Sequence, residues 1–196
     1  MKKFGIVLVL CITGLMAQDY VGTKKCKMCH NKTKSGKQYS VWAETKHAKA
    51  FEALKTEEAL KYAQERGIKV SPTEAPECVK CHVTGYDKGG YEIKGDDFWS
   101  QVTDKGKPTK EVKLMSALQS VGCEACHGPG SKYKKKKTMK GIFDGTLAAA
   151  DYGLTIPDEK TCVKCHNEES PSYKPFNFDE FVQKIAHNFP EGFRQQ

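Results

Sequence analysis

Long apolar runs and histidine are both scarce in this 196-residue sequence, which contains six histidines. No stretch reaches the roughly 18 consecutive apolar residues of a membrane span, so a channel or transporter that crosses the bilayer repeatedly is excluded. Hydrophobic residues make up only 38% of the chain and charged residues 29%. Because that is a thin supply for a core built of side chains alone, the composition predicts that a bulky cofactor fills part of the interior.

Other functional signatures are also missing. No basic helix interleaved with aromatic residues is present, so nucleic acid is not expected as a partner. Neither a Ser/His/Asp set nor a pair of carboxylates suggests hydrolytic catalysis. The run Lys134 to Lys137 is typical of a solvated face, with docking of an acidic partner as the alternative.

The N-terminal segment has the pattern of an export signal. Lys2 and Lys3 precede a short apolar run from Phe4 to Met16, and the small residue Ala17 follows. We therefore predict a signal peptide over residues 1–17, a mature domain over residues 18–196 and a periplasmic or secreted location. Cys11 lies within the signal and would be discarded with it, leaving eight cysteines in an oxidising compartment.

Those eight cysteines fall into four Cys-x-x-Cys-His motifs, and four of the six histidines directly follow a second cysteine. Random placement would give this arrangement with a probability of roughly one in a million. The motif residues are Cys26, Cys29 and His30; Cys78, Cys81 and His82; Cys123, Cys126 and His127; and Cys162, Cys165 and His166.

This spacing is typical of covalent haem attachment. Two thiols bind the two vinyl groups of one haem, and the adjacent histidine becomes the proximal iron ligand. Two alternatives are Cys₄ zinc sites and redox disulfides, but neither gives the histidine a role. The sequence predicts four covalently bound haem c groups. Their propionates would bring the mature net charge of +6 to about +2 when oxidised and about −2 when reduced.

The periodicity between the motifs predicts a mainly α fold, with small helices and loops wrapped around four closely stacked haems and little β structure. Segment 85–100 is expected to form a turn with a short hairpin. Helices are expected at residues 35–54, from Thr56 to Arg66, along 114–121, after the cap Asp158 and at residues 178–187.

The supply of axial ligands limits the chemistry. Only His47 and His187 remain after the four proximal histidines, so at most two irons can have two histidine ligands from this chain. Met139 and Met115 are candidate ligands because a thioether is the usual alternative to imidazole. Met115 lies near an apolar stripe and could instead fill the core, and Met139 could instead lie in a solvated loop.

The sequence resembles the tetrahaem cytochrome c-554 family over nearly the whole mature chain. The residues that carry this resemblance are Tyr20-Val21-Gly22, Trp42 with His47-Ala48-Lys49-Ala50, Cys78 to Val83 with Gly85 and Gly89-Gly90-Tyr91, Gly122 to Gly130, and Phe176 to Glu180. The resemblance implies a helical fold with stacked haems, His47 opposite His166 and His187 opposite His127. It also implies that the haem on His82 has no distal protein ligand.

One departure from the family concerns the first haem. Where the family has a distal histidine after the third motif, this chain has Ser131-Lys132-Tyr133 and further lysines, with Met139 two residues beyond the expected place. Met139 is therefore predicted to be the distal ligand opposite His30.

The family carries electrons in the periplasm, the founding type from hydroxylamine oxidation, so we expect a carrier with a redox protein donor and acceptor. The identity of those partners does not transfer. Two alternatives remain: a reductase of a small nitrogen oxide such as nitric oxide at the His82 haem, and a subunit of an extracellular haem filament that self-associates.

Overall fold

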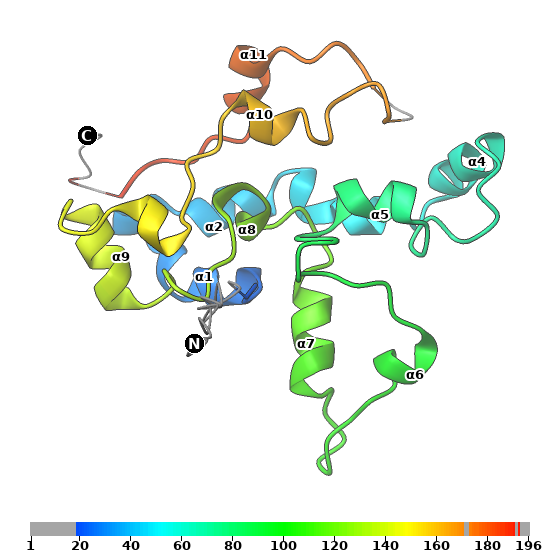
Figure 1. Ribbon diagram of the computed structural model, residues 1–196, viewed down its shortest axis with the longest axis horizontal. Coiled ribbons are helices and arrows are strands. Elements are labelled where there is room, and N and C mark those ends of the chain that lie inside the picture. The colour runs from blue at the N-terminus through cyan, green and yellow to red at the C-terminus, as the bar shows by residue number, and fades with distance from the viewer. Residues whose placement is uncertain (1–18, 171–172, 191, 193–196) are drawn as a thin grey trace, which may run out of the picture.

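The computed structural model describes residues 19–170, 173–190 and 192. The predicted signal peptide at residues 1–17 lies outside them. Short helices joined by long loops form an irregular molecule, with α11 on one side and an arm of α6 and α7 on the other (Figure 1). In chain order the elements are α1 Thr23–His30, η1 Thr33–Ser35, α2 Gln38–Ala43, η2 His47–Lys49, α3 Ala50–Ala53, α4 Glu57–Glu65, α5 Pro76–His82, α6 Asp96–Trp99, α7 Lys110–Ala117, α8 Cys123–His127, α9 Lys136–Phe143, η3 Ala149–Tyr152, α10 Glu159–Cys162 and α11 Phe178–Val182.

The prediction of a mainly α fold with little β is confirmed. Within the described ranges, the only β pairing is an isolated bridge between Val102 and Pro108. The prediction of a short hairpin at residues 85–100 is wrong. The Gly90 amide folds back onto the carbonyl of Gly85, and that of Tyr91 onto Thr84, so this segment forms a turn without paired strands. No helix in the described part of the chain is long and apolar enough to span a bilayer.

The helix expected over residues 35–54 is broken into η1, α2, η2 and α3. Thr45 causes the break before His47, because its hydroxyl donates to the carbonyl of Trp42 at 2.7 Å and accepts from the Ala48 amide at 3.4 Å. Such side-chain bonds compete with the helical ladder. The break leaves His47 at the start of η2, in a new direction.

Two predicted helix starts, at Thr56 and after Asp158, are confirmed. The Thr56 side chain caps α4 by accepting from the Ala59 amide, and Gly67 follows the helix with a φ of 72°. Asp158 caps α10 in a capping box with Thr161. The last helix ends at Val182, earlier than expected, so His187 lies in the segment beyond it.

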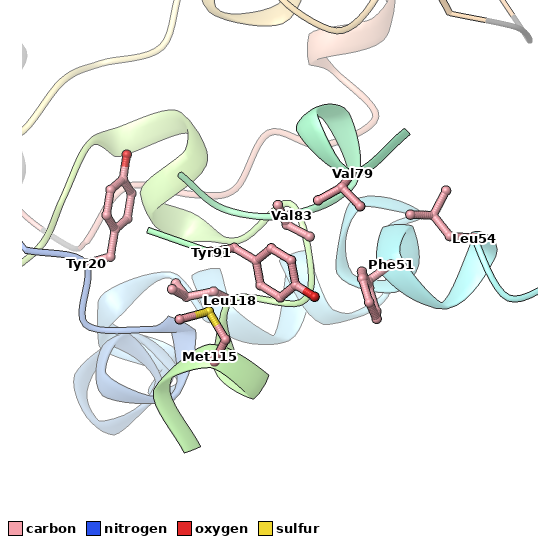
Figure 2. Close-up of a cluster of buried hydrophobic side chains, with 8 residues drawn as sticks. All are labelled: Tyr20, Phe51, Leu54, Val79, Val83, Tyr91, Met115 and Leu118. Carbon is pink, nitrogen blue, oxygen red and sulfur yellow. The ribbon is translucent and has the colours of Figure 1, made fainter. Parts of the chain in front are cut away.

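The apolar core is small and lies beside the second motif. Figure 2 shows its side chains, which come from the N-terminal segment, α3, α5, α7 and the turn after α5. Leu118 and Val79 are fully buried. The cluster consists of Tyr20, Phe51, Leu54, Val79, Val83, Tyr91, Met115 and Leu118.

Candidate haem-binding sites

The first three motifs lie at the ends of short helices. α1 ends at His30, α5 at His82 and α8 at His127, whereas the fourth motif begins at Cys162, the last residue of α10. Cysteines three residues apart lie on one face of a helical turn, where both thiols can reach the same partner. All eight motif cysteines are free thiols, so the redox-disulfide alternative finds no bridge in this structure.

The zinc alternative does not fit the arrangement of donors. A Cys₄ site requires four thiolates that converge on one point. Among residues 19–170, 173–190 and 192, no group of three or more histidine, cysteine, aspartate or glutamate side chains converges in this way. The motifs instead present two thiols and one imidazole each, which is the donor set of a covalently attached haem.

Three of the four proximal histidines are oriented by a hydrogen bond from Nδ1. This contact fixes the ring and leaves Nε2 free to bind a metal, as is usual for metal-binding histidines. The acceptors are the Gln38 Oε1 atom for His30 at 2.5 Å, the Ala50 carbonyl oxygen for His82 at 2.5 Å and the Thr155 carbonyl oxygen for His127 at 2.9 Å. The ring of His166 is instead stacked on Phe176, with centroids 4.9 Å apart.

The two remaining histidines each lie opposite a proximal histidine. The ring centroids of His47 and His166 are 5.9 Å apart, and those of His187 and His127 are also 5.9 Å apart. Two imidazole nitrogens bound to one metal ion from opposite sides, each at about 2 Å, would hold the centroids roughly 6 Å apart. The spacing of both pairs therefore fits an iron ion between the rings.

The electrostatics of these pairs also suit iron binding. Burial lowers the pKa of all four histidines, and for His47 and His187 the facing imidazole lowers it further. A lowered pKa favours the neutral imidazole, which is the form that binds a metal. The buried Nδ1 atom of His187 has no hydrogen-bond partner in the described part of the chain. When bound, a haem supplies an iron that takes up and releases one electron.

Met139 and the first motif face the same cavity. This cavity has a volume of about 450 Å³, and its walls include Cys26, Cys29, His30 and Met139. α9 places Met139 there. Met115 lies elsewhere: it is buried in the core cluster, where its sulfur accepts a hydrogen bond from the Glu92 amide at 3.1 Å. Of the two methionines, Met139 is therefore the one positioned at a haem motif.

Thiols from different motifs contact one another. The side chains of Cys26 and Cys123 share a hydrogen bond that lowers the pKa of Cys26 and raises that of Cys123. Cys81 and Cys165 form a second such contact, which lowers the pKa of Cys81 to about 7. These contacts join the first motif to the third and the second to the fourth.

The third and fourth motifs are neighbours as well. Burial raises the pKa of Cys126, and the nearby Cys162 raises it further. Cysteines of successive motifs thus lie near one another in the order first, third, fourth and second.

A buried carboxylate holds the first and third motifs together. Glu124 lies inside the third motif with 2% of its surface exposed. It accepts hydrogen bonds from the amides of Gly22 at 2.7 Å and Gly130 at 2.6 Å, and from that of Val21 at 2.9 and 3.2 Å. Because Gly22 precedes α1, Glu124 fixes the start of the first motif against the third.

Sequence reasoning did not find Glu124, Gln38, Phe176 or the carbonyl groups that orient His82 and His127. Carbonyl acceptors leave no trace in a sequence, since every residue carries one. The one sequence signal that could have indicated Glu124 is a carboxylate between the two cysteines of a motif, but its hydrogen-bond partners are revealed only by the fold.

The motifs, free thiols and facing histidines define a multihaem c-type cytochrome. The family described as "Cytochrome c554 and c-prime" matches residues 25–128. Cytochrome c-554 of Nitrosomonas europaea is 31% identical, over 85% of this chain and 73% of the relative. The solved structure of that protein in its reduced state has a TM-score of 0.55 and 30% identity, over 87% of this chain and 86% of the other.

The chain belongs to the cytochrome c-554 family. Electron transfer through covalently bound haem c follows from this membership.

Proposed function

We propose that this protein is a periplasmic tetrahaem cytochrome that carries electrons between a redox donor and a redox acceptor. The observation that supports this most directly is that cysteines of successive motifs lie near one another. The three pairs are Cys26 with Cys123, Cys126 with Cys162, and Cys165 with Cys81. Haems attached at adjoining sites can exchange electrons without an external mediator. A single-haem shuttle would have no need for such a series.

In this proposal each of the four motifs holds one haem. The proximal ligands are His30, His82, His127 and His166. Met139 is the distal ligand opposite His30, His187 lies opposite His127, and His47 lies opposite His166. The haem on His82 has no distal ligand from the protein. The facing rings support two of these assignments, and the shared cavity supports Met139. Since both spare histidines lie beside other motifs, His82 is left without a second imidazole.

Export is the second part of the proposal. The pattern of Lys2 and Lys3 followed by an apolar run and Ala17 supports cleavage near residue 17. N-terminal sequencing of protein recovered from the periplasmic fraction should begin near Gln18. Protein that retains residues 1–17 in a cytoplasmic fraction would contradict this part.

Haem content and internal electron exchange test the carrier role. Pyridine haemochrome analysis and intact mass should give four haems per chain. After rapid reduction by less than one electron per chain, the absorbance changes that report redistribution among haems should proceed at a rate independent of protein concentration. Three haems or fewer in matured protein, or a rate that rises with concentration, would refute the proposal.

A second candidate function follows from the position of the spare histidines. An iron on His82 that lacks a distal ligand could bind and reduce a small nitrogen oxide. Carbon monoxide or nitric oxide should then bind at about one equivalent per chain, and at about two equivalents in Met139→Ala, which uncovers the first site. Failure of the wild-type protein to bind either gas excludes this candidate and leaves the carrier role intact.

A further inference from the structure

The first haem site is surrounded by exposed lysines. The cavity beside Cys26, Cys29 and His30 has five lysines in its walls, and all of them are exposed. We call this surface the lysine face; it consists of Lys25, Lys34, Lys134, Lys136 and Lys140. The two chain segments that supply it, residues 20–43 and 131–143, each contain six lysines and no acidic residue. The fold therefore gathers positive charge from two distant segments around one motif.

Little of this charge is neutralised. In the described ranges, Lys140 pairs with Asp144, and the other four lysines of the face have no ion-pair partner. The nearby Glu124 is buried and occupied by backbone amides. Two propionates of a haem at this site would offset only part of the total. Since lysines held close together repel one another, stability gives no reason for the arrangement.

Two lysines near the other motifs have acidic partners. Lys80, within the second motif, contacts Glu169 just after the fourth motif at 2.5 Å. Lys184 contacts Glu180 at 2.6 Å beside the ring stack on His166. The first site differs in that four lysines line one cavity without an ion-pair partner in the described ranges, on two segments that contain no acidic residue. That site is also open, because Cys29 is exposed and 69% of the neighbouring Met28 is exposed.

We propose that the lysine face is the docking surface for an acidic redox protein, and that electrons pass between this partner and the molecule at the first haem. The inference rests on the proposed carrier function. Opposite charge steers a partner during its approach and fixes its orientation. A partner held at the lysine face would lie against the exposed edge of the first motif, at one end of the series of attachment sites.

A charge-reversal pair tests the proposal. In the double variant Lys134→Glu/Lys136→Glu, the net charge of the lysine face becomes four units more negative than in the wild type. The control Lys105→Glu/Lys107→Glu changes the net charge equally at exposed residues in the loop between α6 and α7, at the tip of an arm away from α9 (Figure 1). Haem content and optical spectra should match the wild type in both variants, since all four lysines are exposed.

Reduced flavodoxin, an acidic protein, serves as the electron donor in stopped-flow measurements at low and high ionic strength. At low ionic strength the second-order rate constant should fall roughly tenfold or more for the face variant and stay within about twofold of the wild type for the control. The wild-type rate should decrease as salt is added. Carbodiimide cross-linking to flavodoxin should yield linked peptides from segment 131–143.

Two results would overturn the proposal: equal loss of rate in both variants, or cross-links that lie mainly outside the lysine face. Either result leaves the carrier function standing provided that internal redistribution among the haems is intact. Loss of that redistribution in the wild-type protein would instead contradict the proposed function itself.

Discussion

At the residue scale, the two histidines outside the motifs, His47 and His187, each place a second imidazole opposite a motif histidine. His47 is directed toward His166 because Thr45 ends α2, and its carbonyl accepts the Val121 amide at 3.1 Å. The Trp42 indole N–H donates to the Val121 carbonyl at 2.9 Å. Residue 121 is therefore held from both sides just before the third motif. The position of His47 is in this way tied to the neighbouring third motif.

Replacement of His47 or His187 should uncover one iron each. In His47→Ala and in His187→Ala, one of the low-spin haems should become high-spin, because the chain has no spare histidine to replace the lost ligand. EPR spectra of the oxidised proteins would measure the change, and the double variant should show the sum. An unchanged spectrum in either single variant contradicts the corresponding assignment.

Glu124 should make a large contribution to stability. Glu124→Ala leaves the buried amides of Gly22 and Gly130 without their acceptor, so the free energy of unfolding should fall by about 4 kcal/mol. Glu124→Gln keeps one acceptor oxygen and should lose less. Denaturant unfolding of the haem-loaded protein measures both losses.

Glu77→Ala is the control for this series, since Glu77 is exposed beside the second motif. Its effect should stay within about 0.5 kcal/mol. If Glu124→Ala behaves like Glu77→Ala, the hydrogen bonds of Glu124 do not hold the first and third motifs together.

At the scale of the elements, glycine determines how closely α1 and α7 approach. Gly22 precedes α1 with a φ of 79°, and a Cβ atom there would lie 2.8 Å from the Cβ atom of Ala117 at the end of α7. Gly67, after α4, has a similar φ of 72° but no atom within 4 Å of such a Cβ. An alanine at Gly67 would therefore have backbone strain only, whereas an alanine at Gly22 would have backbone strain and a steric clash.

Substitution by alanine should therefore have different effects at these two glycines. Gly67→Ala should lower the free energy of unfolding by about 1 kcal/mol, from the positive φ alone. Gly22→Ala should lower it by about 3 kcal/mol, because the helices must also move apart. Equal losses in thermal or denaturant unfolding would mean that α1 and α7 adjust freely.

The elements also show what a sequence can predict. The caps Thr56 and Asp158 and the helical class depend on neighbours within a few residues, and the sequence predicted them correctly. The break at Thr45 went unpredicted because periodicity does not report bonds between a side chain and the backbone. The positions of Met115 and Met139 required the packing of distant segments.

At the scale of the whole molecule, the order of the attachment sites differs from their order in the sequence. The first motif contacts the third, and the second contacts the fourth, so neither of these two contacts joins motifs that are consecutive along the chain. Each contact spans a long intervening segment, including the arm of α6 and α7 (Figure 1). The complete series exists only when the entire chain has folded.

These contacts between motifs set an order of events during assembly. If the chain folds before its haems are attached, Cys26 lies against Cys123 and Cys81 against Cys165. An oxidant then takes two electrons and two protons from each pair and closes a disulfide between motifs. Chain produced without haem attachment and treated with oxidised glutathione should yield these two bridges in peptide mapping. Bridges confined to single motifs would show that the contacts form only after loading. Haem attachment must therefore precede complete folding, because thiols that have formed disulfides can no longer bind the vinyl groups of a haem.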